Sequence, residues 1–208
     1  MRYVEPSTEI LACDGLEACK RIELAARVCY KSEERITETS YVRLLTQLLE
    51  SEHESVLEHA SATVRFVCDR GVSHELVRHR IASFSQESTR YCNYAKDKFN
   101  GECSFIAPPG LSDAALMCWY DAMRSAEHSY FDLLGAGVSP QIARGVLPNS
   151  LKTEVVVTAN MREWRHIFKL RTSPKAHPQM RELMVPLLAK FKALVPIIFD
   201  DLEAASDA

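Results

Sequence analysis

The chain has 208 residues, of which 47% are hydrophobic and 25% are charged. These values are typical of a compact globular protein, and we expect a single domain that spans residues 1–208. The formal net charge of −3 gives no overall positive field of the kind that attracts nucleic acids regardless of their sequence. Clusters of arginine in this chain therefore require a local explanation.

The seven cysteines are odd in number, and no two of them form a Cys-x-x-Cys pair. This spacing argues against a disulfide framework and against a zinc cluster. Reduced thiols in the cytoplasm are expected, since the first residues lack the apolar core of a secretory signal. The apolar stretch 183–199 contains Lys190, Lys192 and two prolines, which predicts a core-facing helix in place of a membrane span.

Hydrophobic spacing predicts four elements in the first third of the chain. Between residues 61 and 70 the residues alternate, with Ala62, Val64 and Phe66 on one side, as they do in a half-buried strand. Leucines at three- to four-residue spacing follow a good helix cap, Thr39. The predicted elements are a strand over 3–11, a helix over 16–30, a helix from Thr39 to about Ser51, and a strand over 61–70.

Helical and strand patterns continue to alternate along the rest of the chain. Ser73 is a good N-cap and Glu75 complements the helix dipole, so a helix is predicted from Ser73 to about Ile81, with a polar loop after it. Pro140 is expected to begin a short helix that Pro148 ends. The other predictions are helices over 111–134 and 138–147, a strand over 151–160, and helices over 161–170 and 178–202. This mixed order without repeats or linkers indicates one α/β or α+β unit.

The run Arg78-His79-Arg80 is the first candidate for chemistry. Neighbouring helical residues point in different directions, so these three cannot share one solvated stripe and at least one must point inward. A buried arginine requires an anionic or hydrogen-bonding partner. The segment 83–90 then adds hydroxyl, amide and charged groups without glycine, a composition typical of a ligand-facing loop. The alternative is a helix end with a solvated basic face.

Two further stretches concentrate polar side chains. Residues 53–59 read His-Glu-Ser-Val-Leu-Glu-His, and their histidines are six apart, which does not place them on one helical face as a zinc pair requires. In residues 160–168, Arg162 and His166 are four apart and share a helical face, while Trp164 lies on another face that can contact the core. The alternative for both stretches is a charged, solvated helix surface.

Together these motifs resemble those of the flavin-dependent thymidylate synthases. Arg78-His79-Arg80 followed after seven residues by Ser88 is the signature of that family, and Arg90-Tyr91 extends the match. The family also carries a His-Glu-(Ser/Thr)-x-x-Glu-His stretch before the signature, and later an Ala-Arg-x-x-Leu-Pro segment, an Asn-x-Arg and an arginine that closes a helix. This chain has Ser85 where the family usually has asparagine.

The resemblance implies an α/β (α+β) fold, a single domain in which a central, mostly antiparallel twisted sheet is flanked by helices. It also implies a homotetramer whose active sites lie between subunits. The implied reaction is the reductive methylation of dUMP to dTMP, with 5,10-methylenetetrahydrofolate as one-carbon donor and NADPH-reduced FAD as hydride source. In the family no enzyme nucleophile is thought to add to uracil C6; an arginine near the pyrimidine favours its electron-rich form. Arg171 is expected to be that catalytic arginine.

The resemblance assigns other polar residues to two ligands and implies neither a metal site nor a nucleic-acid or membrane partner. The residues expected to bind dUMP are Glu75, Arg78, Gln86, Glu87, Ser88, Arg90, Arg144 and Arg171. The residues expected to bind FAD are His53, Ser55, Glu58, Arg78, His79, Arg80, Asn160, Arg162 and His166. Arginines suit such ligands because their charge-assisted hydrogen bonds to phosphate are strong.

A module that binds nucleic acid or nucleotides without catalysis is the alternative function. It would use the arginines of the signature run, with Tyr91 and Tyr94 as stacking aromatics. The net negative charge of the chain and the lack of a recognised nucleic-acid-binding motif argue against it. A nucleophilic role for Ser88 with His79 as its base is disfavoured, because no Gly-x-Ser-x-Gly elbow surrounds the serine.

Overall fold

The computed structural model describes residues 1–204, which divide into two compact units. Unit 1 contains residues 1–7, 66–78 and 85–155, and unit 2 contains residues 8–65, 79–84 and those from 156 onward. The boundary between the units falls within the four strands of one antiparallel sheet, in the order β2-β3-β6-β4. These strands are β2 (Ser7–Cys13), β3 (Ser61–Asp69), β6 (Lys152–Asn160) and β4 (Ala82–Gln86). The mixed α/β fold is confirmed, while one domain over 1–208 stays a prediction.

The two central strands follow the alternation that the sequence predicts. In β3, Ala62, Val64 and Phe66 are buried, and the residues between them are at least partly exposed. β6 shows the same two-residue period. The hydroxyls of Thr63 in β3 and Thr158 in β6 lie 2.9 Å apart, a cross-strand hydrogen bond on the face opposite the core residues.

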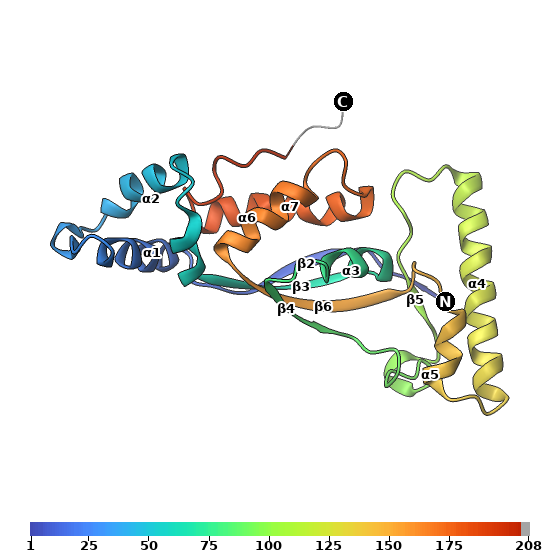
Figure 1. Ribbon diagram of the computed structural model, residues 1–208. Helices are drawn as coiled ribbons and strands as arrows, with labels where there is room; N and C mark the ends of the chain where they lie inside the picture. Colours follow the sequence, from blue (N-terminus) through green and yellow to red (C-terminus); the bar gives the residue numbers. More distant parts are fainter. Residues whose placement is uncertain (205–208) are drawn as a thin grey trace. The chain divides into compact units, whose positions relative to one another are not determined.

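Within the described residues, unit 2 contains four α-helices, of which α6 (Met161–Arg171) lines the candidate site described below. α6 and α7 lie side by side (Figure 1). The predicted bounds of α1, α2 and α6 are confirmed to within two residues, and the predicted start of α7 is confirmed. α7 ends eight residues before the predicted limit, because the residue before Pro196 is biased away from helical geometry. The helices are α1 (Leu16–Val28), α2 (Ser40–Glu50), α6 (Met161–Arg171) and α7 (Pro178–Leu194), with 3-10 turns η1 (Glu33–Arg35) and η2 (Glu54–His59).

Four buried aromatic rings form the centre of unit 2. Trp164 and Phe168 of α6 pack against Phe191 of α7 with ring centroids 5.2 and 5.1 Å away, and Phe199 closes the cluster at 5.2 Å from Phe191. The first turn of α6 is fixed by its cap, Asn160, whose side-chain oxygen accepts a hydrogen bond from the Glu163 amide at 2.8 Å. The polar face of α6 is thereby held outward while its aromatic face is buried.

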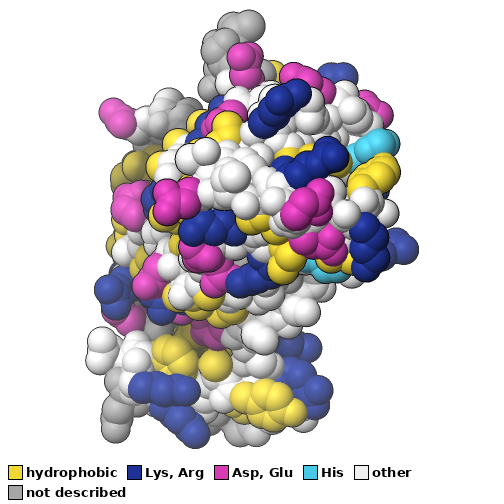
Figure 2. Space-filling view, turned by 90° about the vertical axis from the view of Figure 1, so that its left-hand side faces the viewer, with side chains coloured by type: hydrophobic (Ala, Val, Ile, Leu, Met, Phe, Trp, Pro, Cys, Tyr) yellow, Lys and Arg dark blue, Asp and Glu magenta, His cyan; other side chains and the backbone are white. Residues whose placement is uncertain are grey.

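Unit 1 is organised around its longest helix, α4, whose buried Tyr130 packs against Tyr94 with ring centroids 5.8 Å apart. None of the helices in residues 1–204 is both long and apolar enough to cross a membrane. Figure 2 shows basic and acidic side chains mixed over much of the face that it presents. The elements are β1 (Arg2–Tyr3), paired in parallel with β5 (Ser104–Phe105), α3 (Arg70–Leu76), η3 (Asp97–Phe99), α4 (Asp113–Gly135), α5 (Pro140–Ala143) and η4 (Arg144–Val146).

Helix α3 differs from its prediction at both ends. Its N-cap is Asp69, whose carboxylate accepts a hydrogen bond from the Val72 amide at 2.8 Å, so Ser73 lies inside the helix. Because the helix begins three residues early and ends at Leu76, the prediction of a helix that carries Arg78-His79-Arg80 is wrong. This motif lies in the connection to β4. The prediction of a loop after the motif is also wrong at β4, because the backbone there is paired in the sheet.

The first strand is interrupted where the sequence predicts a continuous one over 3–11. β1 ends at Tyr3 and β2 begins at Ser7, on either side of Pro6. Proline has no amide hydrogen to give to a sheet, so a strand that contains one is readily broken there.

We predict that Phe191→Ala lowers the free energy of unfolding by about 3–5 kcal/mol, because it opens a cavity between three other buried rings. Urea denaturation followed by fluorescence measures this loss. Leu194→Ala on the same helix is the control, since Leu194 is 43% exposed and should cost less than about 0.5 kcal/mol. Equal losses in the two variants would contradict this account of the core.

Candidate active site

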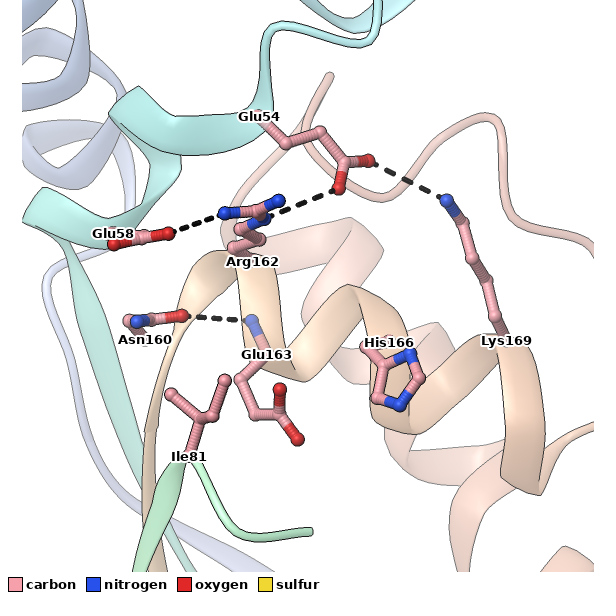
Figure 3. Close-up of a pocket in the computed structure, with 8 residues that line it drawn as sticks. All are labelled: Glu54, Glu58, Ile81, Asn160, Arg162, Glu163, His166 and Lys169. Atoms are coloured by element: carbon pink, nitrogen blue, oxygen red, sulfur yellow. Dashed lines mark hydrogen bonds and ion pairs between the residues drawn. The ribbon is translucent and has the colours of Figure 1, made fainter.

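A cavity of about 380 Å³ lies in unit 2 along the polar face of α6 (Figure 3). Four of its residues were predicted from the sequence to bind FAD, namely Glu58, Asn160, Arg162 and His166. They come from η2, the end of β6 and α6, so residues about 100 positions apart along the chain are brought together. The other lining residues, which the sequence did not single out, are Glu54, Ile81, Glu163 and Lys169.

Ion pairs connect the two walls of this cavity. Arg162 donates to Glu58 at 2.6 Å and lies 4.0 Å from Glu54, and Lys169 approaches Glu54 at 3.5 Å (Figure 3). The exposed members of such pairs contribute little to stability because water screens them. Their positions nevertheless place two cationic side chains beside two carboxylates at the cavity mouth, where an incoming anion can compete for the cations.

Arg165, on the buried side of α6, also connects this helix to η2. Its guanidinium is 2% exposed and forms a bidentate pair with Asp201 at 2.6 and 2.7 Å. It also donates to Glu54 at 3.1 Å and to the carbonyl of Ile198. Hydrogen bonding from Arg165 lowers the pKa of the Asp201 carboxyl. Because a buried guanidinium is tolerated only when its donors are paired, these contacts fix η2 against α6.

The inward-pointing member of the Arg78-His79-Arg80 motif is the histidine. Arg78 and Arg80 are exposed, whereas His79 is 5% exposed. Arg171 Nε donates to His79 Nε2 at 3.0 Å, and the ring of His166 lies edge-on at 5.8 Å. Burial, then the positive charge of Arg171 and the electrostatic interaction with His166, lower the pKa of His79 to about 4. His79 is therefore a neutral hydrogen-bond acceptor at physiological pH.

The structure does not bring every residue expected at the flavin into this cavity. His53 and Ser55 lie on the N-cap and first turn of η2 with exposed side chains, and Arg80 is exposed before β4. Arg78 belongs to unit 1. Within the described residues, the cavity lining includes none of these four side chains.

Unit 1 contains a second polar cavity of about 260 Å³, with Arg70, Thr89 and Arg144 on its walls. Arg144 donates from Nη1 to the Thr89 hydroxyl at 3.0 Å. Arg70 Nη1 is buried and has no hydrogen-bond partner among the described residues. Since a buried charged donor without an acceptor is costly, two arginines that share one cavity fit an anionic ligand. The rest of the lining is Gly145, Leu147 and Leu151.

Most residues expected at dUMP also belong to unit 1, where several have partners within the protein. Gln86 donates to the hydroxyls of Ser73 at 2.9 Å and Thr153 at 3.2 Å. Glu87 accepts from Tyr94 at 3.2 Å and pairs with Lys152 at 3.3 Å. These two side chains therefore fix the segment that leads into residues 88–90.

The remaining residues of this group lie nearer the surface. Ser88 is half-buried and accepts a hydrogen bond from the Arg90 amide at 3.3 Å. The Arg90 guanidinium is exposed and lies over the Tyr91 ring at 5.5 Å, and Glu75 is half-buried in the last turn of α3. Arg171, in contrast, belongs to unit 2 with the candidate flavin residues.

Sequence reasoning missed Arg70, Glu54 and Glu163. Glu54 is the second residue of the His-Glu stretch, and that motif was a usable signal. Glu163 is three residues before His166 and shares its helical face, so the spacing was a signal too. No sequence signal marked Arg70, because this residue lies before the start of the predicted helix.

Comparison with known proteins agrees with the motifs. A model of the family described as thymidylate synthase complementing protein matches residues 13–197. The flavin-dependent thymidylate synthase of Geobacter sulfurreducens is 37% identical over 189 residues, which cover 86% of this chain and 80% of that protein. The enzyme of the same name from Pyrococcus furiosus is 37% identical over 174 residues, covering 81% and 70%.

A solved structure extends the likeness to the fold. The crystal structure of a UMP/dUMP methylase PolB from Streptomyces cacaoi, bound with 5-Br dUMP, is similar with a TM-score of 0.81. The two proteins are 25% identical, and the match covers 96% of each chain. Sequence, motifs and fold agree, and the chain belongs to the thymidylate synthase complementing protein family, that of the flavin-dependent thymidylate synthases.

Proposed function

We propose that the cavity of unit 2 binds FAD and that the cavity of unit 1 binds the phosphate of dUMP. The chain is a flavin-dependent thymidylate synthase, an enzyme that methylates dUMP with FAD as cofactor. The observation that carries the first assignment is the convergence of Glu58, Asn160, Arg162 and His166 on one cavity. These are residues that the family motifs assign to the flavin.

The lining of the unit 2 cavity fits part of FAD. Arg162 and Lys169 supply positive charge for the pyrophosphate, and Glu58 and Asn160 supply oxygen acceptors. Ile81 adds an apolar contact. The volume of about 380 Å³ lies within the range of small-molecule sites, near its lower end. When bound, FAD supplies the hydride for the new methyl group.

Arg171 is the residue that we assign to the pyrimidine. Making uracil C5 nucleophilic places negative charge on the ring, and a fixed guanidinium stabilises that charge without reorganising during the reaction. The hydrogen bond from Arg171 Nε to His79 fixes one side of the group. The neutral imidazole accepts this bond without adding a positive charge near the arginine.

Arg70 and Arg144 are the residues that we assign to the phosphate of dUMP. The unpaired Arg70 Nη1 has a donor available for a phosphate oxygen, and Arg144 is held at the same cavity by Thr89. The binding of a dianion there would compensate both guanidinium charges. Ser88 and Arg90 lie directly beside Thr89 in the sequence and are the further phosphate donors of this proposal.

A homotetramer with shared active sites is part of the same proposal, as are NADPH, 5,10-methylenetetrahydrofolate and a cytoplasmic location. Its support is the exposure of Ser55, Arg80 and Arg90, which the motifs assign to ligands. Residues at a ligand site shared between subunits are exposed in a single chain and covered after assembly. Sedimentation of the FAD-loaded enzyme at the mass of one chain would contradict the tetramer.

We predict that Arg171→Ala and Arg171→Lys both retain FAD and lower kcat for dTMP formation at least about 100-fold. Lysine should fail because it has no planar group with several fixed donors. The measurements are the visible spectrum after gel filtration and a dUMP-dependent dTMP assay. Arg21→Ala is the control, since this exposed arginine pairs with Asp14 and does not belong to the lining of the unit 2 cavity. Full activity of Arg171→Ala would refute the assignment.

We predict that Arg162→Ala weakens FAD retention about tenfold or more, because it removes a charge-assisted donor from the cavity. Flavin stoichiometry after dialysis, read from absorbance, measures the effect. Arg43→Ala on α2 is the matched control, since it removes an exposed arginine outside the cavity lining. Unchanged flavin stoichiometry in Arg162→Ala would place FAD elsewhere.

We predict that Arg70→Met raises the KM for dUMP about tenfold or more, since a hydrogen bond to a charged group contributes about 1.5–3 kcal/mol. Without ligand, this variant should be as stable as the wild type or more stable, because the buried Nη1 donor has no partner to lose. Thermal unfolding with and without inorganic phosphate tests both statements. Phosphate should raise the Tm of the wild type and of the control Arg43→Met, but should have little effect on Arg70→Met. An unchanged KM would remove Arg70 from the site.

A further inference from the structure

Glu163 is a buried carboxylate in the first turn of α6 to which the family motifs assign no role. It is 7% exposed, and burial raises the pKa of its carboxyl. Its Oε1 lies 3.5 Å from Nδ1 of His79. The ring of His166 is also near, since His79, Glu163 and His166 offer ligand atoms that all lie within 4.8 Å of one another. Of these two histidines, His79 is buried and makes the 3.5 Å contact, whereas His166 is exposed, so the buried carboxylate calls for a role that involves the His79 ring.

The hydrogen bond that Arg171 donates to the His79 ring defines which ring nitrogen is protonated. Arg171 Nε carries a hydrogen and donates it to His79 Nε2, so Nε2 must present its lone pair. The proton of a neutral imidazole is then on Nδ1, the nitrogen that faces Glu163. Three side chains therefore form a line, from the carboxylate through the imidazole to the guanidinium.

We propose that Glu163 is a positioning residue for Arg171 and acts through His79. The carboxylate favours the Nδ1–H tautomer of the imidazole, and Nε2 then fixes the guanidinium through its Nε–H. Buried carboxylates orient histidines in this manner at serine-protease and zinc sites, where the second partner sets which ring nitrogen is available. The inference rests on the proposed function of Arg171, since positioning this arginine matters for turnover only if it contacts the pyrimidine.

A metal ion is the competing explanation for these side chains. His79, Glu163 and His166 offer ligand atoms that all lie within 4.8 Å of one another. However, Nε2 of His79 already accepts a hydrogen from Arg171, and a cation would lie close to a permanent positive charge. The hydrogen bond from Arg171 at Nε2 and the 3.5 Å contact with Glu163 at Nδ1 account for both nitrogens of His79 without this repulsion.

The test uses FAD-loaded wild type, Glu163→Ala and Glu163→Gln. In the wild type, ¹⁵N NMR of labelled histidine should show His79 protonated on Nδ1 and unprotonated on Nε2. Glu163→Ala removes the acceptor beside Nδ1 and leaves the preference supported by Arg171 alone, so the preference should weaken. The same variant should lower kcat about 10- to 100-fold, the range lost when a group that orients a histidine is removed. The KM for dUMP should change less than about threefold, because Glu163 acts on the arginine and makes no contact with substrate in this proposal.

Glu163→Gln distinguishes positioning from a need for negative charge. The glutamine oxygen still accepts the Nδ1 hydrogen, so this variant should keep the tautomer and stay within about threefold of the wild-type kcat. Asp132→Asn is the matched control, since it removes an exposed carboxylate 3.3 Å from His128 on α4 and should leave kcat unchanged. The far-UV circular dichroism and Tm of each variant report folding, and kcat is measured at saturating FAD because Glu163 also lines the cavity assigned to the flavin.

Three outcomes would overturn the inference: an unchanged His79 tautomer in Glu163→Ala, an unchanged kcat in that variant, or stoichiometric metal that Glu163→Ala releases. The proposed function fails by a different result, full activity of Arg171→Ala. In that case the tautomer would still respond to Glu163, so the two failures are distinguishable.

Discussion

The buried guanidinium of Arg165 is the constraint on which the architecture of unit 2 depends. Removing this charge from water is tolerable only because Glu54, Asp201 and a backbone carbonyl satisfy its donors. Glu54 belongs to η2, so the requirement to pair Arg165 determines where η2 lies against α6. The position of η2 in turn places Glu58 opposite Arg162. The geometry of the candidate flavin cavity is thus a consequence of one electrostatic requirement beneath it.

The two cavities balance charge in opposite ways. In unit 2 the cations at the cavity are paired with carboxylates, and His79 stays neutral beside Arg171 because burial and neighbouring charge disfavour its proton. In unit 1 a guanidinium nitrogen of Arg70 is buried and has no acceptor within residues 1–204. The charges at the unit 2 cavity are therefore balanced without a ligand, whereas the unpaired donor at the unit 1 cavity is satisfied only when an anion binds.

The sequence predicted most of the elements and the amphipathic face of α6, because a helical period of 3.6 residues separates Arg162 and His166 from Trp164 without any knowledge of the fold. It failed where two local signals competed, since Asp69 caps α3 in preference to Ser73. The spacing to His166 could place Glu163 on the polar face of α6, but neither its contact with His79 nor the burial of Arg70 Nη1 could be predicted, because both depend on parts of the chain distant in sequence. His79 and Arg171, for example, are 92 residues apart and meet only in the folded chain.

The pairing of Arg165 with Asp201 also limits how this protein can be shortened. Segments near a terminus usually tolerate deletion, because few buried groups depend on them. Here a chain cut before Ile198 would lose both the carbonyl and the carboxylate that pair with Arg165. Because its donors would then lack acceptors, the Arg165 guanidinium would require water molecules next to the aromatic cluster of α6 and α7. Residues 196–201 therefore belong to the minimal folding unit, although they lie outside the helices and strands of the described residues.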